Sequence, residues 1–171
     1  MRYFFDTEFI EDGTTVDLIS IGVVCEDGRE FYAVSQEAQL HRASAWVRAN
    51  VLPHLPKYGD PAWMSREDIR ARLVAFTHAE KQPDLAHWKP EFWAYYADYD
   101  WVALCQLFGI MMNLPEHYPK FCMDLKQLAV MNGNPALPKQ ESGEHDALAD
   151  ARWNRDVYAF LTALPKGGVT P

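Results

Sequence analysis

The feature that most constrains this chain is a pair of acidic residues inside an apolar N-terminal segment. Residues 2–9 read Arg-Tyr-Phe-Phe-Asp-Thr-Glu-Phe, a pattern that predicts a β-strand. Because alternate side chains of a strand point to opposite faces, Asp6 and Glu8 share one face. The opposite face takes the flanking Tyr3, Phe5 and Phe9. Two like charges on a mostly buried strand are unfavourable unless a cation neutralises them, so the segment predicts a divalent metal site with further ligands from elsewhere.

A second acidic residue lies on an apolar face of the last predicted helix, at residues 147–161. Asp150 falls at helical spacing on a stripe that otherwise looks buried. The stripe consists of Ala147, Ala151, Asn154, Val157, Tyr158 and Leu161. Its alanines would let the helix approach a sheet closely. Asp146 is predicted as the N-cap, because its side chain can accept from the free backbone donors of the first turn. His145 then lies just outside the helix, at the end of the loop 132–144.

A third acidic position is Asp100. It follows an apolar strand predicted around 91–97 and opens a helix predicted at 99–109, where a side chain can reach the end of the sheet. Asp98 competes for this role. We assign Asp98 to capping or loop duty, because a residue that precedes a helix suits a cap, and we assign Asp100 to the site, because the apolar run 102–107 follows it directly.

The order of the predicted elements indicates an α/β fold. Further strands are expected at 17–25 and 29–35, and Asp-Gly pairs at 12–13 and 27–28 are strong hairpin signals. The first third therefore predicts a three-stranded antiparallel meander within a mixed sheet.

Helical patterns and loops account for the remaining segments. Helices are predicted at 37–50 and at 66–79, the latter opened by Ser65 with Asp68 three positions on. Asp124 is predicted to cap another helix, and the Pro-rich segments 53–61 and 83–90 are predicted as loops. Aromatic residues at 88, 93, 95, 96 and 101 are assigned to the core by default.

Length and composition indicate one soluble domain. The chain has 171 residues, of which 49% are hydrophobic, and we expect a single domain over 1–171 with a flexible tail from about 164. The longest nearly uncharged stretch, 101–114, is too short to span a bilayer, and the N-terminus lacks a secretory pattern. Three scattered cysteines suit buried thiols in a reducing compartment, so a cytoplasmic location is expected. These are Cys25, Cys105 and Cys122.

The charge balance restricts the kind of nucleic-acid binding that is possible. A net charge of −8 argues against a protein that coats long nucleic acid through a basic surface. An enzyme that holds only a chain end through metal ions is compatible with that charge.

The three acidic motifs together resemble a known group of enzymes. Asp-x-Glu on the first strand, Asp at a strand-to-helix junction and His-x-x-x-x-Asp on the last helix resemble the DEDDh group of 3′-to-5′ exonucleases, which share the ribonuclease H-like fold. A more detailed resemblance, to about Phe160, is to the polyadenylate-specific 3′-exoribonuclease family of actinobacteria. Its matching segments are 1–10, 18–24, 99–107 and 145–148. This resemblance also assigns the middle motif to Asp100.

The resemblance implies a two-metal hydrolysis of phosphodiester bonds, with ions about 4 Å apart. Hard ions such as Mg²⁺ or Mn²⁺ prefer oxygen ligands, which Asp6, Glu8, Asp100 and Asp150 would supply. His145 would act as general base, because imidazole titrates near neutral pH. Phe9 is expected, with Glu8, to contact the terminal nucleotide, because aromatic faces stack on unpaired bases.

The expected function is 3′-to-5′ exoribonuclease action on single-stranded RNA 3′ ends, with release of 5′-mononucleotides and an adenylate preference. The resemblance also implies a homodimer. Two alternatives stay open: a 3′-to-5′ DNA exonuclease with the same site, and a catalytically silent nucleic-acid-binding module. Each motif alone also has an ordinary structural explanation, such as a solvated strand face for Asp6 and Glu8 or a helix-start acid for Asp100. Their common order in one chain favours a shared site.

Overall fold

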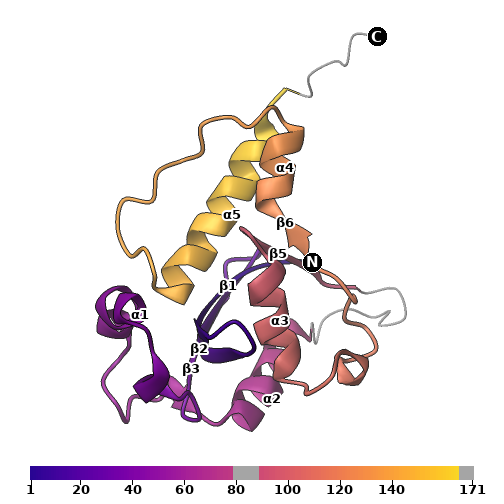
Figure 1. Cartoon of the computed structure of the whole chain (residues 1–171). Helices are drawn as coiled ribbons and strands as arrows, with labels where there is room; N and C mark the ends of the chain where they lie inside the picture. Colours follow the sequence, from indigo (N-terminus) through magenta and orange to yellow (C-terminus); the bar gives the residue numbers. More distant parts are fainter. Residues whose placement is uncertain (79–88, 166–171) are drawn as a thin grey trace.

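The computed structural model of the chain describes residues 1–78 and 89–165 (Figure 1). Its strands are β1 (Arg2–Glu11), β2 (Val16–Cys25), β3 (Glu30–Ser35), β4 (Trp63–Met64), β5 (Glu91–Ala94) and β6 (Met123–Asp124). Its α-helices are α1 (Ala45–Asn50), α2 (Arg66–Thr77), α3 (Asp98–Gln106), α4 (Leu125–Met131) and α5 (Ala147–Ala163). Short 3₁₀ turns occupy Leu40–Arg42, Leu52–His54 and Met111–Asn113.

The strands form one mixed sheet in the order β4-β3-β2-β1-β5-β6. The β1, β2 and β3 strands pair antiparallel, which confirms the predicted meander, whereas β4, β5 and β6 join by parallel pairing. Glycines at both predicted hairpins adopt positive φ, +82° at Gly13 and +90° at Gly28, as such turns require. The site strand β1 therefore lies inside the sheet, between β2 and β5.

Helices cover both faces of this sheet, and the alternation along β1 decides which side chain meets which helix. Tyr3 and Phe5 belong to a core with α2 and α3, whereas Phe4 belongs to a core with α4 and α5. Asp6 and Glu8 continue the register of Phe4. The two carboxylates therefore emerge on the face that α5 covers, as the period of two predicts.

A glycine on β2 allows α5 to lie directly on the sheet beside the site (Figure 1). Gly22 is the cross-strand partner of Asp6, and a Cβ added there would lie 2.2 Å from the backbone oxygen of Ala147. The predicted buried stripe is present, since Ala147, Ala151 and three further residues of α5 are buried. The Asn154 side-chain amide donates to the backbone oxygen of Phe5 at 2.9 Å and joins α5 to β1.

Three helix starts carry the predicted side-chain caps. Ser65, Asp124 and Asp146 accept from the backbone N–H of the residue three positions later, at the starts of α2, α4 and α5. Each such bond satisfies a backbone donor that the helix itself leaves free. The capping residues in the sequence were therefore sufficient to predict where these three helices start.

The continuous helix predicted at 37–50 is wrong. The segment contains a 3₁₀ turn and then α1, separated at Ser44, whose backbone is extended with φ −64° and ψ 164°. The Ser44 side chain accepts from Val47 N–H as an N-cap, and a capping residue cannot itself be helical.

The predicted junction between β5 and α3 also needs correction. The strand ends at Ala94 instead of residue 97, and Tyr96 has φ +55°, which turns the chain sharply. Asp98 is an exposed first residue of α3, not its cap, since the preceding Ala97 provides no side-chain cap and its N–H donates to Asp124. Tyr96 is 63% exposed, so its assignment to the core is wrong.

Other aromatic predictions have mixed outcomes. Trp93 and Trp101 are buried as expected, and Tyr95 is half-buried. The predicted helix end at residue 79, most of the loop at 83–90, Trp88, and the tail after residue 165 lie outside the described residues.

Candidate active site

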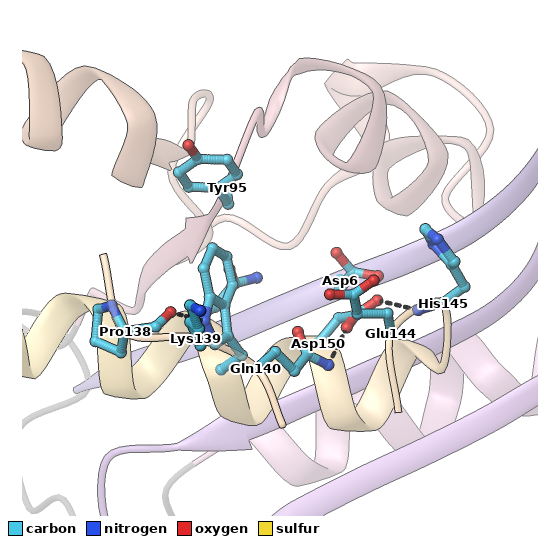
Figure 2. A pocket seen from close by; sticks show the side chains of 10 residues that line it. Asp6, Tyr95, Pro138, Lys139, Gln140, Glu144, His145 and Asp150 are labelled. Atoms are coloured by element: carbon cyan, nitrogen blue, oxygen red, sulfur yellow. Dashed lines mark hydrogen bonds between the residues drawn. The ribbon is translucent and has the colours of Figure 1, made fainter. Parts of the chain in front are cut away.

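The structure brings the predicted acidic residues together at the first turn of α5. Asp6 and Glu8 come from β1, and Asp150 comes from the first turn of α5. Figure 2 shows Asp6 and Asp150 close together. Carboxylate oxygens of Glu8 and Asp150 and a ring nitrogen of His145 all lie within 4.8 Å of one another. Two distant chain segments therefore meet where the sequence placed their motifs.

Asp100 approaches β1 from α3 and is fixed by the residue between the two β1 carboxylates. The backbone N–H of Thr7 donates to Asp100 Oδ1 at 2.9 Å, and its hydroxyl donates to the same oxygen at 2.6 Å. Asp100 is buried, as is Thr7. Thr7 points away from the face of Asp6 and Glu8, and so it connects the carboxylate of α3 to the strand that carries the other two.

Asp150 is held by the loop that precedes α5. The Gln140 side-chain amide donates to Oδ1 at 2.6 Å, and the backbone N–H of His145 donates to Oδ2 at 2.9 Å, as the dashed lines in Figure 2 show. His145 adopts φ +67°, a conformation that a non-glycine residue rarely takes. This backbone turn directs its N–H toward Asp150 while the chain enters the helix at Asp146.

The His145 ring contacts α1. The rings of Trp46 and His145 have centroids 4.8 Å apart and planes inclined by 77°. Trp46 remains 54% exposed, so its ring forms a wall of the site that solvent still reaches. The imidazole is therefore bordered by the indole in addition to the backbone contact with Asp150.

Burial and mutual repulsion raise the pKa of the four acidic residues predicted from the sequence. The pKa of Asp6 is raised well above its usual range by burial and then by the charges of Asp100, Asp150 and Glu8. Burial, together with the charges of Asp150 and Asp100, raises the pKa of Glu8 to about 8. The pKa of Asp100 is raised to about 6 by burial, although the bonds from Thr7 lower it. Burial also raises the pKa of Asp150, against the bonds from Gln140 and His145.

These residues fit a site for hard divalent cations. Four carboxyl groups with raised pKa values converge, so a bound cation would favour their charged forms. The four acidic side chains offer oxygen donors, which suit Mg²⁺ or Mn²⁺. The arrangement could hold such ions against a phosphate group of a substrate.

Sequence reasoning missed four residues that build this site. They are Thr7, Gln140, Trp46 and Gly22. Thr7 stands between two acidic residues, and that position was the available signal for it. Trp46 and Gly22 act on neighbours about a hundred or more positions away, and Gln140 lies in an irregular loop, so no local pattern marks them.

Comparison with known proteins identifies relatives over almost the whole chain. Two proteins of Mycobacterium tuberculosis are each 47% identical to it over 168 residues, which cover 98% of this chain and 97% of the relative. They are 3′-5′ exoribonuclease MT2234.1 of strain CDC 1551 / Oshkosh and 3′-5′ exoribonuclease Rv2179c of strain ATCC 25618 / H37Rv.

Among the described residues, no helix is long and apolar enough to cross a membrane.

A family model supports the same relationship. The model of the 3′-5′ exoribonuclease Rv2179c-like domain matches residues 1–162, a range that includes β1, α3 and the first turns of α5 with all four acidic positions. The chain therefore belongs to the Rv2179c-like 3′-5′ exoribonuclease domain family.

Proposed function

We propose that this protein is a metal-dependent 3′-to-5′ exoribonuclease that hydrolyses single-stranded RNA ends to 5′-mononucleotides. The observation that carries the proposal is the convergence of Glu8, Asp150 and His145 within 4.8 Å, with Asp6 and Asp100 beside them, in a chain of this family. The mixed sheet and the order of the acidic motifs support a ribonuclease H-like fold of the DEDDh type.

The four carboxylates are assigned to metal binding. Asp6 is half-buried and its carboxyl group interacts with the charges of the other three, so it would hold metal together with them, whereas Glu8 and Asp150 lie together beside His145. Asp100 is fixed through Oδ1 by Thr7 and contributes from the α3 side. When bound, two divalent ions would supply an activated water and stabilise the leaving oxygen.

His145 is assigned as the general base. A neutral imidazole can accept the proton of the attacking water as the phosphodiester bond is hydrolysed. Its position supports this role, since the ring lies beside Glu8 and Asp150 and is bordered by Trp46. The proton would pass from water to a ring nitrogen, and the 3′ oxygen of the preceding nucleotide would leave.

Phe9 is assigned to the terminal nucleotide. A register shift in β1 occurs between Glu8 and Phe9, and the Phe9 ring stacks on Tyr99 with centroids 5.7 Å apart and planes inclined by 10°. Tyr99 is 51% exposed. A half-exposed aromatic pair beside the carboxylates suits stacking on a base or sugar. The proposed adenylate preference rests on the resemblance to the polyadenylate-specific family, because stacking on an aromatic ring does not itself distinguish the bases.

The test is direct. Labelled oligoribonucleotides and matched oligodeoxyribonucleotides are incubated with the protein and Mg²⁺, and the products are separated. Stepwise release of 5′-mononucleotides from RNA is expected, with oligoadenylate degraded faster than other homopolymers. Release from DNA alone would favour the DNA exonuclease alternative, and no release from either would contradict both enzyme functions.

The variant His145→Ala is expected to lose about 10²- to 10⁴-fold in kcat, the usual contribution of a positioned general base. Divalent metal binding, measured by calorimetry with Mn²⁺, should persist because the carboxylates remain. His54→Ala, at an exposed histidine outside the site, is the matched control and should retain full activity. Loss of metal binding in His145→Ala would contradict the assignment as base.

Metal affinity is expected to depend on pH through Glu8. Its pKa is raised from 4.5 to about 8 in the metal-free protein, so the folded protein binds a proton there that the unfolded chain does not. The metal-free protein should therefore lose stability as pH rises from about 5 to about 8. Mg²⁺ should bind more tightly and restore thermal stability over the same interval, because it replaces the proton.

Thermal unfolding with EDTA and with Mg²⁺, at several pH values, checks this expectation. Glu8→Gln should weaken both dependences, because it removes one titrating group, while Asp100, with a pKa of about 6, remains. A metal-free protein whose stability rises toward pH 8 would contradict the argument.

A further inference from the structure

A cavity extends from the carboxylates along α5, on the side away from Phe9. Its volume is about 470 Å³, within the range of about 300–1,000 Å³ that small-ligand sites occupy. Asp6, His145 and Asp150 line one part of it, but Glu8 and Phe9 do not. The cavity therefore meets the site from the Asp6 side, whereas the Phe9–Tyr99 pair lies beyond Glu8.

The far part of the cavity has a different chemistry. Pro138 and Lys139 lie there on the loop before α5, and Tyr95 stands opposite them, as Figure 2 shows. Trp153 of α5 also lines this part of the cavity. Its ring lies edge-on to Tyr95, with centroids 5.2 Å apart, and its indole N–H donates to the backbone oxygen of Pro138 at 2.9 Å. The latter bond fixes the loop that carries Lys139.

Lys139 supplies the cationic side chain of this part of the cavity. Its side chain is exposed, and within residues 1–78 and 89–165 it forms no ion pair. Glu144, the exposed acidic residue that also lines the cavity, lies toward Asp6 and His145 in Figure 2, away from Lys139. An uncommitted ammonium group beside aromatic rings suits a phosphate and its attached nucleoside.

We propose that this cavity binds the nucleotide on the 5′ side of the bond that is cut, with Lys139 contacting the 5′-phosphate of that nucleotide and Tyr95 bordering its sugar and base. The proposal rests on the proposed exoribonuclease function. A strand whose terminal nucleotide lies at Phe9 and whose last phosphodiester lies at the carboxylates must continue on the Asp6 side. Among the described residues, this cavity lies on the Asp6 side of the carboxylates and could receive the continuing strand.

The consequence is a preference for substrates that carry this phosphate. In a protein of net charge −8, a lysine at this subsite supplies a local positive charge that attracts the phosphate. A charge-assisted hydrogen bond to a phosphate contributes roughly tenfold in kcat/KM at a site open to solvent.

The experiment compares two diadenylates that differ only at the 5′ end, one with a 5′-phosphate and one with a 5′-hydroxyl. The wild-type protein with Mg²⁺ should cleave the phosphorylated one with a several-fold higher kcat/KM. Lys139→Ala should lose this preference and retain the wild-type kcat/KM on the 5′-hydroxyl substrate. Lys89→Ala is the matched control and should keep the preference. Lys89 is also exposed, but it precedes β5, whereas Tyr95 of the cavity follows that strand.

Each outcome separates this proposal from the proposed function. Cleavage of both dinucleotides without a preference in the wild type, or with a preference that Lys139→Ala retains, would overturn the subsite and leave the exoribonuclease function intact. An equal loss on both substrates in Lys139→Ala would also overturn it, since Lys139 would then act on the terminal nucleotide or the scissile phosphate. Absence of cleavage of either dinucleotide and of longer RNA would contradict the proposed function itself.

Discussion

Asp6→Asn is expected to reduce kcat by at least about a thousandfold, because the loss of a bridging metal ligand removes several kcal/mol of transition-state stabilisation. The substitution keeps the size of the side chain and removes its charge. The pKa of Asp6 is raised by burial and by the charges of all three other acidic residues, Asp100, Asp150 and Glu8. Asp6 therefore interacts with the whole group, and ions held by that group would depend on it. Mononucleotide release under saturating Mg²⁺ measures the effect.

The same variant separates a chemical loss from unfolding. Because Asp6→Asn removes one member of a buried, mutually repelling group, the metal-free variant should unfold at a higher temperature than the wild type at pH 8. Asp146→Asn is the matched control. Asparagine caps helices as well as aspartate does, so this variant changes a nearby charge but keeps the bond to Ala149 N–H. Activity of Asp6→Asn within tenfold of wild type would contradict its assignment to metal binding.

Gly22→Ala is expected to reduce both stability and activity. Its Cβ would meet the backbone of Ala147 at 2.2 Å and of Leu148 at 2.4 Å, and backbone atoms cannot rotate away as a side chain can. Alanine in a strand is otherwise more favourable than glycine, so the sign depends on this clash. We expect a loss of about 1–3 kcal/mol in the free energy of unfolding, as for overpacked cores.

The activity loss follows from where the clash occurs. The first turn of α5 carries Asp150, which must stay in register with Asp6, and a displacement of about 1 Å at a catalytic group can cost about a hundredfold in rate. Chemical denaturation and kcat at 25 °C measure the two effects.

Gly28→Ala serves as the control for Gly22→Ala. Gly28 has φ +90° in a hairpin with open space around it, so alanine there strains the backbone without moving α5. It should lower stability while kcat is retained. Equal kcat values for the wild type and Gly22→Ala would show that α5 tolerates the added methyl group.

The parts of the site that could be predicted from the sequence depend on short-range rules. The period of two along β1 placed Asp6 and Glu8 on one face, and the hairpin glycines and three caps fixed the meander and the starts of α2, α4 and α5. The prediction failed where a local signal was ambiguous. Residues 37–50 have a helical pattern throughout, but Ser44 caps a shorter helix within it.

Tertiary contacts explain the remaining errors. Asp98 was a reasonable cap by position, but α3 begins at Asp98 itself, so the cap position falls on Ala97. The N–H of Ala97 donates to Asp124, 27 residues away. The short strands β4 and β6 have two residues each and exist because neighbouring strands pair with them. No propensity over so few residues could indicate them.

The sequence by itself determined which chemical groups the site contains and which element each one occupies, because alternation along a strand and capping of a helix are properties of a few consecutive residues. Only the tertiary structure decided how these groups are held. Thr7 fixes Asp100, Gln140 fixes Asp150, and the bare backbone of Gly22 allows α5 to lie close to β1. These contacts join segments up to 126 residues apart, and their geometry depends on packing that no local pattern encodes.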